Sequence, residues 1–139
     1  MCFKVSSPSV DRLEISSVSL LSMIQSKGWK VPMNLLDSQY WYTTPENWAT
    51  VLQSVFLSDI YVPETYDCED YALEAMVLVS KKFGLNTFAM AIGNVPGGRH
   101  GFNVFYTDNG WWIYEPQPGY GLGYFPLGEN GYIPELILI

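Results

Sequence analysis

The chain has 139 residues, and its 7 basic and 14 acidic side chains give a formal net charge of −7. This length fits one domain with a sizeable core, and a hydrophobic content of 48% is too high for a disordered chain. The excess of acids argues against binding to nucleic acid or to anionic membranes, which rely on basic side chains. The sequence has no signal-peptide-like apolar stretch near its start and no run of ~20 apolar residues that could span a membrane. We therefore expect a soluble, cytoplasmic protein.

Residues 1–30 are expected to form an N-terminal extension with one short helix, and residues 31–139 the core of what is overall a single domain. The helix is predicted just before a glycine stop at Gly28, where apolar residues recur. The extension also carries Cys2, which could pair with Cys68. Because chain termini tend to fray and Cys68 opens a predicted helix, two free thiols in a reducing compartment are favoured.

Two amphipathic helices are predicted in the middle of the chain. The first covers about residues 45–58, because Thr44 is a good N-cap, a proline follows it, and apolar residues recur at helical spacing. The second begins at Cys68 after the N-cap Asp67 and ends at Gly84.

Beyond this helix the hydrophobic period changes to two, which predicts strands. Four strands are expected, at residues 85–92, 101–106, 111–115 and 132–139. A hairpin turn marked by Asn109-Gly110 joins the second strand to the third. Because helices precede strands, the predicted class is α+β, with the helix that starts at the cysteine packed on an antiparallel sheet.

Three residues carry the chemistry of the sequence. Cys68 opens a predicted helix, His100 opens a strand, and Glu115 ends the next strand. A thiol, an imidazole and an orienting carboxylate are the parts of an activated nucleophile. The N–H groups of a first helical turn stabilise a thiolate and can bind an oxyanion, whereas the neighbouring acids Asp67 and Glu69 oppose ionisation. We therefore expect Cys68, His100 and Glu115 to form a catalytic site for acyl transfer.

Whether His100 and Glu115 meet depends on the register of the hairpin. If the turn is centred on Thr107-Asp108, the two residues lie directly opposite each other and can touch. If Asn109-Gly110 form the centre, they share one sheet face but lie roughly 13 Å apart along the strand. The catalytic hypothesis needs the first register, or a bulge that restores it.

The residues around this site resemble the core of the transglutaminase-like superfamily, including its bacterial cysteine-proteinase branch. The similarity covers Cys68–Ala72, Gly84-Leu85, His100–Tyr106, Asp108, Gly110-Trp111 and Tyr114–Pro116. In that family a cysteine opens a helix, a histidine opens one strand and an aspartate ends the next. Glutamate stands here in place of the aspartate; a Cys–His–Glu set also occurs in the protease domains of some fungal agglutinins, which depend on calcium.

The resemblance implies a papain-like fold and a thiol hydrolase, peptidase or transglutaminase-type enzyme that acts on peptide, isopeptide or carboxamide bonds. In this scheme Cys68 is the nucleophile, His100 is the general base and then acid, and Glu115 holds the imidazole. The expected partner is a peptide or protein substrate.

Other interpretations of these residues stay open. Glu64, Asp67, Glu69 and Asp70 are alternative calcium ligands, but they lack the Asp-x-Asp-x-Asp-Gly order of a dedicated loop, so no cofactor is expected. One cysteine and one histidine are few ligands for zinc. The position six residues before the cysteine, where papain-like enzymes keep a glutamine, is Val62. This difference and the acids around the thiol permit an alternative, namely a non-catalytic binding module or a phage or microbial structural component on the same scaffold.

Overall fold

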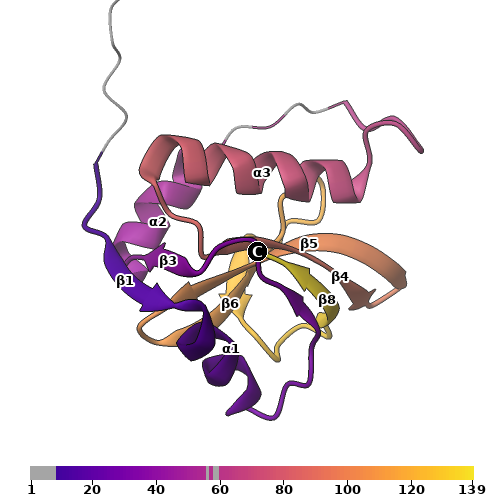
Figure 1. Cartoon of the computed structure of the whole chain (residues 1–139). Helices are drawn as coiled ribbons and strands as arrows, with labels where there is room; N and C mark the ends of the chain where they lie inside the picture. The colour runs from indigo at the N-terminus through magenta and orange to yellow at the C-terminus, as the bar shows by residue number, and fades with distance from the viewer. Residues whose placement is uncertain (1–8, 56, 58–59) are drawn as a thin grey trace, which may run out of the picture.

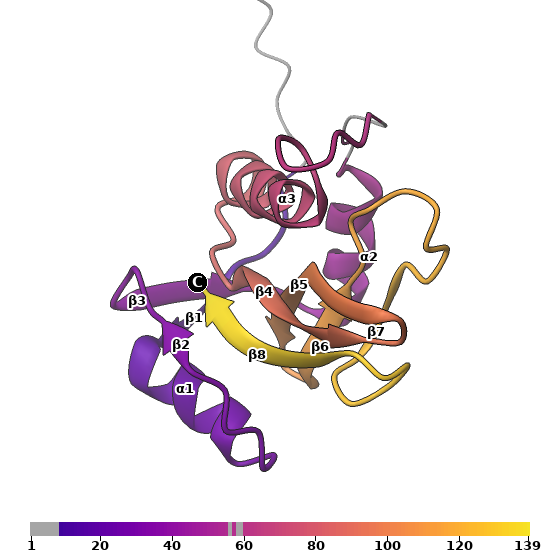
Figure 2. The ribbon, with the colours of Figure 1, turned by 90° about the vertical axis from the view of Figure 1, so that its right-hand side faces the viewer.

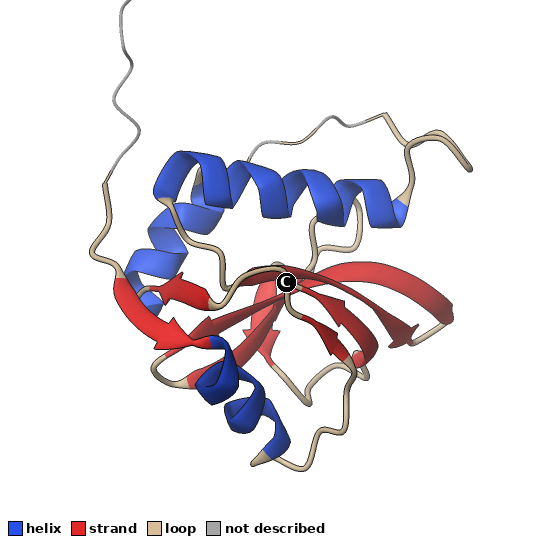
Figure 3. Ribbon diagram, viewed as in Figure 1, coloured by secondary structure: helices blue, strands red, loops and turns tan. Residues whose placement is uncertain are grey.

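The computed structural model describes residues 9–55, 57 and 60–139. Strands are the main element of this part of the chain (Figure 3). In chain order they are β1 (Leu13–Ser16), β2 (Met33–Asn34), β3 (Gln39–Tyr42), β4 (Phe88–Val95), β5 (Gly98–Thr107), β6 (Gly110–Tyr114), β7 (Tyr124–Pro126) and β8 (Ile133–Leu138). Six of them form one sheet in the order β2-β8-β4-β5-β6-β7, and β1 pairs with β3 in a second, two-stranded sheet.

Three helices are present in the described residues, namely α1 (Ser17–Gln25), α2 (Pro45–Gln53) and α3 (Cys68–Phe83). Figure 1 shows α2 and α3 on one side of the larger sheet and α1 on the other. The turned view in Figure 2 shows the same arrangement. Both faces of the sheet are therefore covered.

A hydrophobic core lies on the α1 side of the sheet. Leu20 and Ile24 of α1 are fully buried and belong to one cluster with Phe102 and Val104 of β5. The even-numbered residues of β5 thus point to this side, as strand alternation requires.

A second core lies on the side of α2 and α3. Trp48 of α2 and Val79 of α3 pack in one cluster with Phe88 and Phe105 of the sheet. The indole N–H of Trp48 donates a hydrogen bond to the carbonyl of Tyr106 at 3.0 Å, so this buried ring is anchored as well as packed.

The ends of α3 are set by the residues that the sequence indicated. Asp67 is the N-cap residue, and its backbone N–H donates to the Asp70 carboxylate at 3.2 Å. Gly84 ends the helix in the left-handed conformation with φ 67°, which favours glycine. These signals place Cys68 in the first turn of α3, as predicted.

Two residues of β5 position α3 on the sheet. The Asn103 side chain donates to the carbonyls of Ala72 on α3, at 2.8 Å, and Ala89 on β4, at 2.9 Å. A Cβ atom on Gly101 would lie 2.9 Å from the Cα of Glu69, so only glycine permits this approach of helix and strand. The start of α3 is therefore held directly against β5.

The expected α+β class with a papain-like or transglutaminase-like core is wrong, because the fold is mostly β. Residues 31–44 showed no clean periodicity, yet they contain β2 and β3, and residues 117–131 contain β7. β2 and β7 have only 2 and 3 residues, too few for a hydrophobic period to emerge, and three of the four residues of β3 are consecutive aromatics with no alternation. The large sheet is also mixed and not antiparallel, because β2 runs parallel to β8.

Smaller differences concern single segments. The helix α2 ends at Gln53, whereas the expected end, Ser58, lies outside the described residues. Cys2 also lies outside them, and Cys68 is a free thiol. None of the helices in the described ranges is long and apolar enough to cross a membrane. The boundary expected at residue 30 stays a prediction.

Candidate functional site

The structure joins His100 and Glu115 by a buried side-chain contact. His100 lies in β5, Glu115 directly follows β6, and the distance from Nε2 to Oε2 is 2.8 Å. The two side chains are only 4% and 1% exposed. An imidazole and a carboxylate at this distance hold each other in one orientation.

The hairpin register is neither of the two considered from the sequence. Asn103 pairs with Tyr114 and Thr107 with Gly110, so the turn is centred between those alternatives. Continued by one residue, this register places Glu115 opposite Phe102, diagonal to His100. Diagonal neighbours on one face are within reach of long side chains, which explains the contact without a bulge.

The carboxylate of Glu115 has two further donors. The Tyr132 hydroxyl donates to Oε2 at 2.7 Å, and the backbone N–H of Gln117 donates to Oε1 at 2.9 Å. Burial and the hydrogen bond to Glu115 raise the pKa of Tyr132, so its hydroxyl keeps the proton that it donates. A buried carboxylate with these partners is well compensated for the water that it has lost.

The Cys68 thiol has different partners. Its Sγ donates to the Glu69 carboxylate at 3.2 Å and accepts from the backbone N–H of Gly101 at 3.3 Å. Burial raises the pKa of Cys68, and the hydrogen bond to Glu69 and the charges of Glu69 and Asp67 raise it further against the opposing effect of the Gly101 N–H. At neutral pH the group is therefore a protonated thiol and not a thiolate.

The structure does not join the thiol to the imidazole. Within the described chain, no hydrogen bond links Cys68 to His100. The His100 ring packs with the rings of Phe102 and Tyr132, whereas Gly101 is the β5 residue that approaches Cys68. Of the three predicted residues, His100 and Glu115 thus form a pair, and Cys68 lies beside the strand that carries His100.

A tyrosine that the sequence did not single out covers this pair. The Tyr120 ring stacks on His100 with a centroid distance of 4.6 Å and an interplanar angle of 18°. It lies between Gly119 and Gly121, both with positive φ, in the segment between β6 and β7 that Figure 2 shows rising from the sheet. Tyr120 is 41% exposed, so one ring face packs on the imidazole and the ring remains accessible to solvent.

A second exposed tyrosine lies near the thiol. Partial desolvation and the charges of Asp67 and Cys68 raise the pKa of Tyr61. Burial and the charges of Glu115, Cys68 and Tyr61 raise the pKa of Tyr120. Because such charge effects fall with distance, the two rings and the thiol lie in one neighbourhood, and both phenol hydroxyls stay protonated at neutral pH.

These additional residues differ in the local signals that the sequence carries for them. Tyr120 lies between two glycines, a pattern typical of the tip of a loop. No local pattern connects Tyr132 with Glu115, because their contact spans 17 residues and depends on the fold of that loop.

One cluster could hold a metal ion. The ligand atoms of Asp67, Cys68 and Glu69 all lie within 4.8 Å of one another. Of the four acids considered for calcium, Asp67 and Glu69 belong to this cluster, and Glu64 donates its backbone N–H to Asp67 at 3.1 Å. Calcium usually takes six to eight oxygen ligands, so two carboxylates and a thiol are a poor match. The expectation of no cofactor, with calcium as its alternative, stays a prediction.

Comparisons with known proteins show the fold. No protein-family model matches the sequence, and no curated protein matches it either. A solved structure described as a PSL1a–E64 complex has 18% sequence identity to this chain over 91% of its length, with a TM-score of 0.69. Another, Polyporus squamosus lectin bound to the glycan Neu5Aca2-6Galb1-4GlcNAc, has 18% identity over 91% of the chain, with a TM-score of 0.61. The chain spans 50% of the length of each neighbour.

These neighbours correct the expected family and function. The chains that share the fold are described as PSL1a and as a lectin, which contradicts the expected transglutaminase-like family, the cysteine peptidase or transglutaminase class and the acyl-transfer reaction. The glycan named for the lectin also differs from the expected peptide or protein substrate.

Proposed function

We propose that the chain is a non-catalytic carbohydrate-binding module whose ligand docks on the exposed ring of Tyr120, beside Cys68. One observation carries the proposal: the Tyr120 ring is 41% exposed and is backed by the His100 ring at 4.6 Å. A sugar ring has an apolar face of C–H groups that can pack on an aromatic ring, and its hydroxyls exchange hydrogen bonds with polar groups at the rim.

The support beneath Tyr120 is rigid. Glu115 contacts His100 at 2.8 Å, and Tyr132 donates to Glu115 at 2.7 Å. We call the Tyr120 ring and the residues that support it, His100, Glu115 and Tyr132, the Tyr120 platform. Because this platform is ordered before the ligand arrives, it loses little conformational entropy on binding. In this proposal His100 and Glu115 are thus positioning residues. They belong to the site predicted from the sequence, but they support the Tyr120 ring and do not take part in catalysis.

The rim supplies acceptors and donors for sugar hydroxyls. The carboxylates of Asp67 and Glu69 can accept hydrogen bonds, and the protonated hydroxyls of Tyr61 and Tyr120 can donate them. A side-chain hydrogen bond with Glu69 raises the pKa of Asp67, so the two carboxyl groups are held together at the rim.

The neighbours support the ligand class. Polyporus squamosus lectin is described with a bound glycan, and its fold is shared with this chain. Binding in this proposal uses side chains alone and needs no cofactor, so addition or chelation of calcium leaves it unchanged. A cytoplasmic location is part of the same proposal, supported by the free Cys68 thiol.

Titration calorimetry with the neutral disaccharide Galb1-4GlcNAc tests the proposal. We expect binding by the wild-type chain and a loss of affinity of at least tenfold in Tyr120→Ala. Tyr124→Ala is the matched control, since Tyr124 is similarly exposed, at 45%, but contacts Phe105 and Trp112 in place of His100. Equal losses in both variants, or no binding of the disaccharide by the wild type, would overturn the proposal.

A second experiment tests whether Cys68 is inert. The intact mass of the protein is measured after incubation with E64, the compound named with the PSL1a neighbour. We expect an unchanged mass, because the thiol is protonated and has no hydrogen bond to His100. A covalent adduct at Cys68 that forms at neutral pH and disappears in His100→Ala would overturn the non-catalytic assignment.

A further inference from the structure

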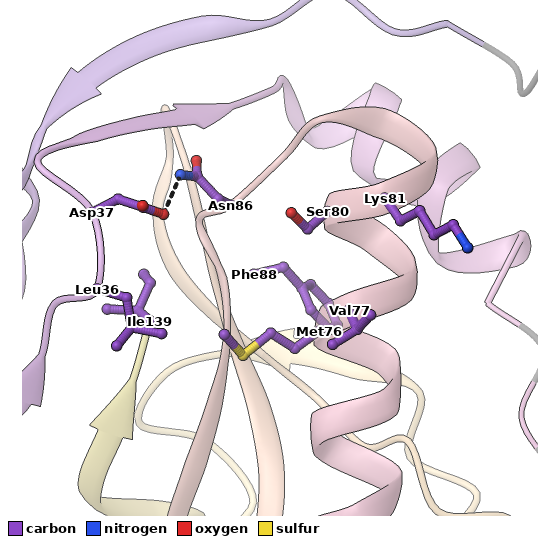
Figure 4. Close-up of a pocket in the computed structure, with 9 residues that line it drawn as sticks. All are labelled: Leu36, Asp37, Met76, Val77, Ser80, Lys81, Asn86, Phe88 and Ile139. Atoms are coloured by element: carbon purple, nitrogen blue, oxygen red, sulfur yellow. Dashed lines mark hydrogen bonds between the residues drawn. The ribbon is translucent and has the colours of Figure 1, made fainter.

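A cavity lies away from the Tyr120 platform, between the C-terminal half of α3, the start of β4 and Ile139 (Figure 4). Its volume is about 270 Å³. Met76 and Val77 come from α3, Phe88 from β4, and Leu36 from the segment between β2 and β3. Four parts of the chain that are distant in sequence thus meet around one hollow.

The cavity has an apolar floor and an apolar rim. Phe88 and Ile139 are buried, with 1% and 2% exposure, and form fixed walls. Leu36 and Val77 are 64% and 59% exposed, so two large apolar side chains face solvent beside the hollow. An apolar group that enters would cover both side chains, which favours binding.

One carboxylate is fixed at the edge of this cavity. Asp37 Oδ2 accepts a hydrogen bond from the Asn86 amide at 3.1 Å. Asn86 is itself held, because it donates to the Gln39 carbonyl at 3.1 Å and accepts from the Trp41 N–H at 2.7 Å. The position of Asp37 is therefore set by the backbone of β3.

The lysine that lines the cavity, Lys81, points away from it. Figure 4 shows its side chain running away from the other lining residues, while the Asp37 side chain points toward the Asn86 amide. A low-dielectric wall strengthens the attraction between a carboxylate and a cation. The cavity therefore has an apolar body and one negative pole.

We propose that this cavity binds a small amphipathic amine, with an aromatic or aliphatic body on Met76, Phe88 and Ile139 and an ammonium group at Asp37. A cavity of 150 Å³ holds benzene, so the available volume suits a ligand of roughly ten non-hydrogen atoms. This site is independent of the Tyr120 platform, because it uses the other end of α3 and shares no residue with that platform.

Three probes of similar shape test the proposal by ¹H–¹⁵N NMR titration. They are 2-phenylethylamine, 2-phenylethanol and 3-phenylpropanoate, which carry a positive, a neutral and a negative head on the same ring. We expect shifts at Met76, Val77 and Phe88, with the amine binding at least tenfold more tightly than the carboxylate. In Asp37→Asn, which keeps an acceptor for Asn86, amine affinity should fall to that of the alcohol, and alcohol affinity should stay unchanged.

A substitution at the rim gives a second test. Val77→Arg places a cation at the mouth of the cavity on an exposed helical position, and Val18→Arg makes the same change on α1, where the valine is 76% exposed. We expect Val77→Arg to weaken amine binding at least tenfold and Val18→Arg to leave it unchanged. Equal binding of the three probes, or equal effects of the two variants, overturns the proposal. Shifts of the same resonances on protein dilution alone would show that a second copy covers the cavity, and would also overturn it.

Discussion

Glu115 reaches His100 diagonally across the β5–β6 hairpin: Oε2 lies 2.8 Å from Nε2, although the strand register continues to place Phe102 opposite Glu115. A diagonal pair on one sheet face is further apart than a direct pair and needs long side chains. The extra methylene of glutamate relative to aspartate is therefore part of the geometry of this pair.

Shortening this side chain should destabilise the protein. Glu115→Asp keeps the charge but cannot keep its hydrogen bonds to both His100 and Tyr132, and a buried group that loses a partner costs about 1–3 kcal/mol. Urea unfolding measures the loss. Glu135→Asp is the control, because Glu135 is an exposed carboxylate 3.0 Å from Arg99, and exposed pairs contribute about 0–1 kcal/mol. Equal losses in both variants would show that the Glu115–His100 contact contributes no more to the free energy of unfolding than an exposed pair.

Tyr132 should matter through its hydroxyl alone. Tyr132→Phe keeps the buried ring and removes the donor to Glu115, so we expect a loss of about 1–3 kcal/mol in the free energy of unfolding, again measured in urea. In a Glu115→Gln background the same change should cost less, since the acceptor is then uncharged. Identical costs in the two backgrounds would mean that the Tyr132–Glu115 hydrogen bond is not the source of the loss.

The sequence predicted the elements with strong local signals. The limits of α3 follow from Asp67 and Gly84, and Asn109-Gly110 marks the hairpin between β5 and β6, although the central pair of its turn is Asp108-Asn109. The sequence did not predict β2 and β7, which have two and three residues. Their conformation depends on pairing with β8 and β6. Such strands are defined by distant partners and have no hydrophobic period of their own.

The candidate site was predicted as a set of residues but not as a geometry. His100 and Glu115 do meet, but through a register that lies between the two considered and not through the one that the hypothesis required. The partners of Cys68 were not predictable, since they depend on how closely α3 approaches Gly101. Tyr120 was missed because its contact with His100 depends on a glycine-rich loop whose path has no sequence period.

The protonation of Cys68 should follow from its surroundings. Burial and the charges of Glu69 and Asp67 raise its pKa, so we expect alkylation by iodoacetamide, followed by mass spectrometry in a Cys2→Ser background, to have a midpoint above the ordinary thiol value of about 8.5. Glu69→Gln removes a charge and should speed alkylation at pH 8. Fast alkylation of the wild type below pH 7 would contradict this assignment.

The same shift has a consequence for stability. The folded protein keeps the Cys68 proton at pH values where the unfolded chain has lost it, so this contribution is fully present below the unfolded pKa of about 8.5 and is lost as pH rises through the folded pKa. Unfolding free energies of wild type and Cys68→Ala should therefore converge or cross as pH increases from 8 to 10. A constant difference over that interval would mean that the thiol pKa is the same in both states.

The charge of the rim should select among glycans. Asp67 and Glu69 lie near Tyr61 and Cys68, which neighbour Tyr120, and the chain has a net charge of −7, so a carboxylate sugar is repelled where a neutral one is not. We expect Galb1-4GlcNAc to bind more tightly than Neu5Aca2-6Galb1-4GlcNAc, the glycan named with Polyporus squamosus lectin, by about threefold to tenfold at low salt.

The salt dependence of binding and one substitution show whether the preference for the neutral glycan comes from charge or from shape. Exposed charges are screened within about 8 Å at physiological ionic strength, so the preference for the neutral glycan should shrink as salt increases. Glu69→Gln should reduce it as well, whereas Glu14→Gln, on β1 of the smaller sheet, should not. If the preference stays constant in salt and in Glu69→Gln, it comes from the shape of the site and not from its charge, because a steric difference does not respond to either change.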